Sequence, residues 1–236
     1  MKRSNIKLEI LFCIFMISIF KKKLSLSKKG EELIRHYKKM VDYGYHRSDG
    51  IHVKNTYEDF ELNNFKDHLA PHFESFNIKN VLDYGGGGSN WEKNGFAGDK
   101  SAKNFFNLDK VINYEPARDL NKIDECDCVV CFDVLEHVYL NDLNKILLNI
   151  YSHAKKLVVI QVACYEAAAL LPTGENAHIT QRPPMWWKGF IDNISIDFPN
   201  TSTMLFCSTR YRHAELFKIW NNAKYDEKEE FTVRLE

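Results

Sequence analysis

A run of four glycines at residues 85–88 is the feature of this sequence with the clearest chemical meaning. It follows Val81-Leu82-Asp83-Tyr84, a short apolar stretch that is typical of a buried strand but carries one acid. Glycine has no Cβ atom and tolerates positive φ, so backbone N–H groups in such a turn can come close to a ligand. The turn therefore predicts a site for a nucleotide-like cofactor. The alternative is a glycine-rich hairpin turn in an unrelated sheet.

The spacing of these glycines separates two classes of cofactor site. The dinucleotide pattern Gly-x-Gly-x-x-Gly fails in both registers, because it meets Asn90 when started from Gly85 and Trp91 when started from Gly86. An apolar pair followed by Asp-x-Gly-x-Gly, here residues 81–87, instead resembles motif I of the class I S-adenosylmethionine-dependent methyltransferases. The resemblance implies that S-adenosyl-L-methionine is the cofactor.

On this resemblance, the turn and the next strand form the cofactor site. Asp83 is expected to brace the turn and the methionine amine, and the cofactor-binding glycines are Gly85, Gly86 and Gly87. A short strand at 111–114 then ends at Glu115. A carboxylate at the tip of the second strand can accept hydrogen bonds from both ribose hydroxyls in doubly wound folds, so Glu115 is the predicted ribose ligand. The alternative is a solvated carboxylate before a turn.

A second segment strengthens the resemblance. Residues 133–138 look like the stretch that closes the cofactor site in many small-molecule methyltransferases of this class. The resemblance implies that the main chain around Phe132 and Asp133 contacts the methionine end of the cofactor and that His137 faces the acceptor. A histidine there could take the proton from an attacking hydroxyl near neutral pH. Alternatively, Glu136 and His137 only hold the following loop in place.

The long polar loop 172–187 is the predicted acceptor loop. It leaves from the carboxyl end of a central strand, where ligands bind in open α/β sheets. It resembles the Asn-Ala-His … Pro-Pro-x-Trp-Trp segment of a group of bacterial and phage methyltransferases. His178 is therefore a second catalytic candidate, and a packing role is equally open for it. Trp186 and Trp187 are expected to pack in the core rather than to stack on substrate.

The cysteines predict no metal site. Cys126, Cys128 and Cys131 are close in sequence, but the odd separation of Cys128 and Cys131 within one strand points their side chains to opposite faces. Free buried thiols suit a reducing compartment, which favours a cytoplasmic protein. The net charge is zero and the pI is about 7.1, so no global basic field attracts nucleic acid. A small-molecule or glycan acceptor is the better expectation.

The first 23 residues differ from the rest of the chain. A basic start and an apolar run over residues 10–20 are followed by three lysines. The run is too short to span a bilayer, and the lysines stand where a signal-peptide cleavage site should be. The segment is either an interfacial anchor that contacts a membrane through residues 6–23 or a non-functional extension.

The elements that must position these residues follow from periodicity and cap signals. Ser27 caps a predicted helix that ends before Gly44 and has an apolar face. A second helix starts near Thr56 and is bent or ended by Pro71. Later helices are expected after an Asn141 cap, from Pro184, and in the tail around 216–220, before a weak edge strand after Phe231. Strands are expected at 81–84, 111–116, 128–132, 157–163 and 203–207.

The alternation of strands and helices predicts an α/β fold with a Rossmann-like, mostly parallel sheet, flanking helices and a helical N-terminal extension. The predicted units are 1–23, the N-terminal helices 24–76, and an S-adenosylmethionine-binding methyltransferase domain 77–236. The predicted function is methyl transfer to an oxygen of a small molecule or glycan. The alternative is a non-catalytic S-adenosylmethionine-binding or interaction module tethered to a membrane. The loop at 89–98 and the short segment 117–127, with no room for both a helix and a strand, keep that alternative open.

Overall fold

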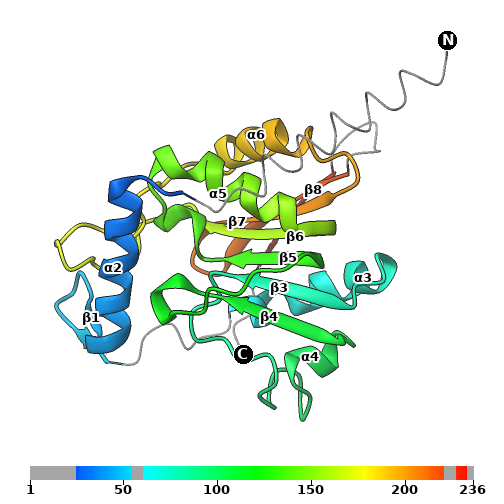
Figure 1. Cartoon of the computed structure of the whole chain (residues 1–236), viewed down its shortest axis with the longest axis horizontal. Coiled ribbons are helices and arrows are strands. Elements are labelled where there is room, and N and C mark those ends of the chain that lie inside the picture. Colours follow the sequence, from blue (N-terminus) through cyan, green and yellow to red (C-terminus); the bar gives the residue numbers. More distant parts are fainter. Residues whose placement is uncertain (1–24, 55–60, 221–226, 233–236) are drawn as a thin grey trace.

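The computed structural model describes residues 25–54, 61–220 and 227–232 (Figure 1). The N-terminal segment 1–23, to which the membrane-anchor prediction refers, lies outside these residues, and so does the predicted start of the second helix near Thr56. Within the described residues, no helix combines the length and the apolar character needed to cross a bilayer.

A mixed, mostly parallel sheet of seven strands forms the centre of the described structure. Its strands are β3 (Asn80–Tyr84), β4 (Lys110–Tyr114), β5 (Cys126–Phe132), β6 (Ala154–Ala163), β7 (Ser202–Arg210), β8 (His213–Ile219) and β9 (Glu227–Thr232). Their order is β4-β3-β5-β6-β7-β8-β9. The first five are parallel, whereas β8 and β9 pair antiparallel at one edge. The predicted α/β class with a mostly parallel sheet is confirmed.

The central strands are apolar on both faces because helices cover both faces. The helices α5 (Leu140–His153) and α6 (Pro184–Ser195) pack on one face, and η1 (Glu61–Phe65), α3 (Lys66–Ser75) and α4 (Ala102–Phe105) pack on the other. Cys131 belongs to the first layer and Cys128 to the second, so the prediction that they face opposite ways is confirmed. Trp187 is fully buried in the first layer, as expected of a core residue.

The strand order reverses beside β3. The chain leaves β3 for the edge strand β4 and then returns to β5, on the other side of β3. The connection from residue 115 to residue 125, which is fully described, carries only the short helix η2 (Pro116–Arg118). The expectation that this connection cannot hold both a helix and a further strand of normal length is confirmed. In open α/β sheets such a reversal opens a crevice at the carboxyl ends of the strands.

Helix α2 (Lys28–Tyr43) stands beside the carboxyl ends of the central strands (Figure 1). Its predicted caps are confirmed: the Ser27 side chain accepts a hydrogen bond from the Gly30 N–H, and Gly44 follows with φ of 82°. The Ser27 N–H and hydroxyl also donate to the two carboxylate oxygens of buried Asp142, at 2.8 and 2.6 Å. The first turn of α2 is thereby joined to the first turn of α5.

A small sheet that the sequence did not predict lies next to α2. Its strands are β1 (Tyr45–His46) and β2 (His52–Val53), which pair antiparallel. The Leu170 N–H donates to the His46 carbonyl at 2.8 Å, so this sheet also contacts the loop that follows β6.

Three details of the predicted elements are wrong. Of the two alternatives for Pro71, the end of the helix is wrong: α3 continues to Ser75, with the proline exposed and Leu69 and Phe73 buried against the sheet. Asn141 does not cap α5, since the helix already begins at Leu140. The tail around Leu216 is strand β8 rather than a helix, and the expected edge strand is β9.

Candidate functional site

A cleft of about 820 Å³ opens at the carboxyl ends of β3, β4 and β5, beside the reversal of strand order. This volume lies within the range of small-molecule sites. Every residue predicted to act in binding or catalysis lines it: Asp83, Gly85, Gly86, Gly87, Glu115, Phe132, Asp133, His137 and His178. The apolar face of α2 supplies the opposite wall through Leu33, Ile34, Tyr37 and Val41.

The glycine turn after β3 needs glycine for two different reasons. Gly85 and Gly87 have φ of 77° and 55°, which side chains disfavour. A Cβ atom on Gly85 would also lie 2.6 Å from a methyl carbon of Val134, and one on Gly86 would collide with the carboxylate of Asp83. The turn therefore packs directly against the segment after β5.

Asp83 braces this turn from inside the protein. The side chain is buried, and one oxygen, Oδ2, accepts hydrogen bonds from the Ser89 hydroxyl at 2.6 Å and from Trp91 Nε1 at 2.8 Å. Burial raises the pKa of Asp83, although these two hydrogen bonds oppose the rise. The sequence did not single out Trp91, because it lies in the irregular stretch 89–98. The predicted contact of Asp83 with a methionine amine stays a prediction.

Glu115 links the tip of β4 to the glycine turn. Its Oε2 accepts a hydrogen bond from the Gly87 N–H at 3.1 Å, and its Oε1 accepts one from the Ala117 N–H at 2.9 Å. Burial raises the pKa of Glu115, and both N–H bonds oppose that rise. The carboxylate is thus part of the cleft wall rather than a solvated group before a turn. Asp124 and Asp127, two acids that follow in the chain, are not among the described residues that line the cleft.

Phe132 and Asp133 end β5 in the floor of the cleft. The Phe132 ring points to the far layer, where it packs on Phe65 with ring centroids 5.5 Å apart. Asp133 has φ of 55°, an uncommon value for a residue with a side chain. Its N–H donates to the Gln161 side-chain oxygen at 2.8 Å, and the Gln161 amide in turn donates to the Ser208 hydroxyl. The side chains of two neighbouring strands therefore hold this backbone conformation.

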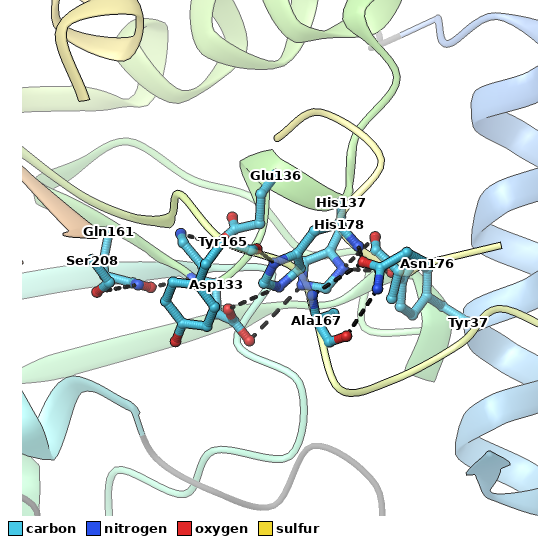
Figure 2. Close-up of polar contacts among 12 residues, drawn as sticks. Tyr37, Asp133, Glu136, His137, Gln161, Tyr165, Ala167, Asn176, His178 and Ser208 are labelled. Carbon is cyan, nitrogen blue, oxygen red and sulfur yellow. Dashed lines mark hydrogen bonds and ion pairs between the residues drawn. The ribbon is translucent and has the colours of Figure 1, made fainter. Parts of the chain in front are cut away.

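The structure brings His137 and His178 together around Asp133 (Figure 2). The two rings meet edge to face with centroids 4.7 Å apart. The Nε2 atom of each ring lies 3.9 Å from an oxygen of the Asp133 carboxylate. Partial desolvation at the cleft floor opposes ionisation of Asp133, whose side chain remains 47% exposed, but the nearby His137 and His178 keep the pKa of its carboxyl below the usual value. Burial and the charge of His137 lower the pKa of His178.

Backbone carbonyls face the other nitrogen of each ring. His137 Nδ1 lies 2.9 Å from the Ala177 carbonyl oxygen and 2.7 Å from the Tyr37 hydroxyl. His178 Nδ1 contacts the carbonyl oxygen of Tyr165. A carbonyl can only accept, so both Nδ1 atoms are assigned the hydrogen, and the Nε2 side of each ring faces Asp133. A role for Tyr37 in the site could not be predicted from the sequence, because Tyr37 belongs to a helix that is distant in the chain.

Glu136 and Asn176 hold the segments that carry the histidines. Buried Glu136 accepts a hydrogen bond from the Ala163 N–H at the end of β6, and burial raises its pKa well above the usual value. The Glu136 side chain thus joins the segment after β5 to the end of β6. Asn176 accepts from the Ala167 N–H and the His178 N–H, each at 3.0 Å, and donates to the Ala167 carbonyl. No separate role for Asn176 was predicted from the sequence.

Chemically, the cleft offers two kinds of group. The turn side has backbone N–H groups, two carboxylates with raised pKa values and no side chains at Gly85, Gly86 and Gly87. The other side has two imidazole nitrogens and a carboxylate that converge. No protein-family model, curated protein or solved structure matches this chain.

Proposed function

We propose that this protein is an S-adenosylmethionine-dependent methyltransferase built on a Rossmann-like sheet, and that it methylates an oxygen of a small molecule or glycan. One observation carries the proposal: Glu115, at the tip of β4, lies against Gly87 of the glycine turn in one cleft beside the strand reversal. Sequence order alone requires no such contact. Ligands of open α/β sheets bind at this place, and an acid there can hold a ribose.

The residues of the cleft fit this cofactor. Glu115 offers oxygens to a ribose diol, and the glycine turn offers close approach without side chains. The volume of about 820 Å³ has room for a nucleoside-sized ligand and an acceptor. When bound, S-adenosylmethionine supplies an electrophilic methyl group; the protein contributes binding and alignment. Asp83 keeps the turn in shape, and the main chain at Asp133 borders the reacting end.

The acceptor side of the proposed site is the corner formed by Asp133, His137 and His178. Its polar atoms suit a hydroxyl better than an apolar group, because two nitrogen lone pairs and a carboxylate can all accept hydrogen bonds. The apolar wall from α2 borders this corner, where the Tyr37 hydroxyl contacts His137. A hydroxyl held here would be aligned by the same side chains that remove or share its proton.

Calorimetric titration of the full chain with S-adenosylmethionine and S-adenosylhomocysteine tests the proposal. We expect micromolar binding, and a loss of about 10- to 100-fold for Glu115→Ala and Glu115→Gln, because hydrogen bonds to charged groups contribute about 1.5–3 kcal/mol. Glu74→Ala is the matched control, since Glu74 is an exposed acid on α3. Absence of binding by the folded wild-type protein would refute the proposal. Unchanged affinity in both Glu115 variants would refute the ribose assignment alone.

A further inference from the structure

We propose that Asp133, His137 and His178 form a binding site for one divalent transition-metal ion at the acceptor corner of the cleft. Each residue offers one ligand atom, and the three atoms lie within 4.8 Å of one another. The sequence predicted no metal site, because two of the ligands follow β5 and the third comes from the distant acceptor loop. Only the fold brings them together (Figure 2).

The orientation of the histidines is that of metal ligands. Metal-binding histidines usually donate their second ring N–H to a carbonyl or carboxylate, which fixes the ring and leaves the other nitrogen free to bind. Here the Ala177 carbonyl takes the Nδ1 hydrogen of His137, and the Tyr165 carbonyl takes that of His178. Both Nε2 atoms then face the carboxylate of Asp133. A divalent cation placed between these three atoms would interact favourably with all of them.

The distances leave room for such an ion. Ligand bonds of about 2.0–2.2 Å place donor atoms about 3.0–3.5 Å apart in octahedral or tetrahedral sites. The observed 3.9 Å between each Nε2 and Asp133 must therefore shorten by less than about 1 Å. The histidine side chains are 12% and 6% exposed and are held by their carbonyl partners, whereas the Asp133 side chain is 47% exposed. Closing the site therefore requires a rotation of Asp133, and the two Nε2 atoms, which lie within 4.8 Å of each other, must come to a similar separation.

The backbone of Asp133 supports the assignment independently. Its φ of 55° is held by the Gln161 side chain, which is itself held by Ser208. A non-glycine residue kept in this region by two further side chains is typical of functional positions. The conformation aims the carboxylate back at His137, four residues later, and at His178.

The donor set selects the class of ion. Two imidazoles and one carboxylate suit Mn²⁺, Fe²⁺, Co²⁺ or Zn²⁺, whereas Mg²⁺ and Ca²⁺ prefer oxygen ligands alone. Three protein ligands leave coordination positions open, and these face the cleft. Metal binding itself does not depend on the proposed function. The role that we assign to the open positions, to bind an acceptor oxygen, does rest on the proposed function.

The test is metal binding to the full chain after chelation and dialysis, without S-adenosylmethionine. We measure Zn²⁺ by equilibrium dialysis and Co²⁺ by visible absorption. We expect one ion per chain, and at least 100-fold weaker binding in His178→Gln and Asp133→Asn. Asparagine tolerates positive φ, so the second variant keeps the backbone, and circular dichroism verifies its fold. His153→Ala is the matched control, because His153 ends α5 with its Nδ1 on the Asn149 carbonyl, outside the cleft.

Two results would overturn the proposal. One is a folded wild-type protein that binds no Zn²⁺ or Co²⁺. The other is binding that both ligand variants retain, which would place the ion elsewhere, for example on cysteine. Because the assay contains no cofactor, its failure is separate from failure of the methyltransferase proposal. If the protein binds the metal but not S-adenosylmethionine, the metal proposal stands, but the role of the metal's open positions in binding an acceptor oxygen does not.

Discussion

Gly85 is the point at which the glycine turn touches the segment after β5, so its replacement probes how the two sides of the cleft fit together. In Gly85→Ala the residue keeps φ of 77°, which costs a side chain about 1–2 kcal/mol. The new Cβ would lie 2.6 Å and 3.1 Å from the two methyl carbons of Val134, an overpacking that typically costs about 1–3 kcal/mol. We expect the free energy of unfolding to fall by about 2–5 kcal/mol.

Urea denaturation followed by circular dichroism measures this loss, and a double-mutant cycle separates its two parts. Val134→Ala removes the methyl groups, so in the Gly85→Ala background it should restore about 1–3 kcal/mol relative to its own effect in the wild type. Gly50→Ala is the control, because Gly50 has φ of 85° but a Cβ there meets nothing within 4 Å. It should show the backbone cost alone. A Gly85→Ala loss no larger than that of Gly50→Ala, or a cycle without coupling, would refute the close contact.

Two further predictions concern single residues. The folded protein binds the Asp83 proton more tightly than the unfolded chain does, so this group destabilises the fold progressively as pH rises above about 4 towards its raised pKa. Asp83→Asn keeps an oxygen for Ser89 and Trp91, and its unfolding free energy relative to the wild type should therefore increase between pH 4 and 7 in urea titrations; a flat difference would contradict the raised pKa. Pro71→Ala should raise stability by about 1–3 kcal/mol, because the proline lies inside α3 and lacks an N–H donor. A loss in thermal unfolding would instead show that the proline ring stabilises α3.

The sequence was sufficient to predict structural features that depend only on neighbouring residues. The Ser27 cap, the Gly44 end of α2, the proline start of α6 and the odd spacing of Cys128 and Cys131 each depend on a few neighbouring residues, and each is confirmed. The prediction of a helix in the tail was wrong because an apolar pair such as Leu216-Phe217 is compatible with either a helix or a strand. Pairing with β7, which no local signal encodes, makes that segment a strand.

The residues of the site likewise divide into those that a local pattern predicts and those that only the fold brings together. Asp83, the glycines and Glu115 could be proposed because each stands at the end of a strand with a recognisable pattern. Tyr37 could not, because its hydroxyl reaches His137 only after α2 packs across the cleft. Nor could the meeting of His137 with His178, which depends on how Asn176 and Ala167 fold the acceptor loop. Contacts between segments distant in the chain carry no periodicity that a sequence can show.

Helix α2 is both a wall of the cleft and a separate segment of the chain, joined to the body through Ser27 and Asp142 and through the Lys38–Asp119 pair. A ligand that contacts its face links binding thermodynamically to the local unfolding of α2. At a ligand concentration of about 100 times Kd, occupation adds about 2.7 kcal/mol to any opening that releases the ligand. The amide protons of α2 would then exchange with deuterium about 100-fold more slowly. Hydrogen exchange of the α2 amides, measured by mass spectrometry, would therefore report whether the cleft is occupied before any substrate is known.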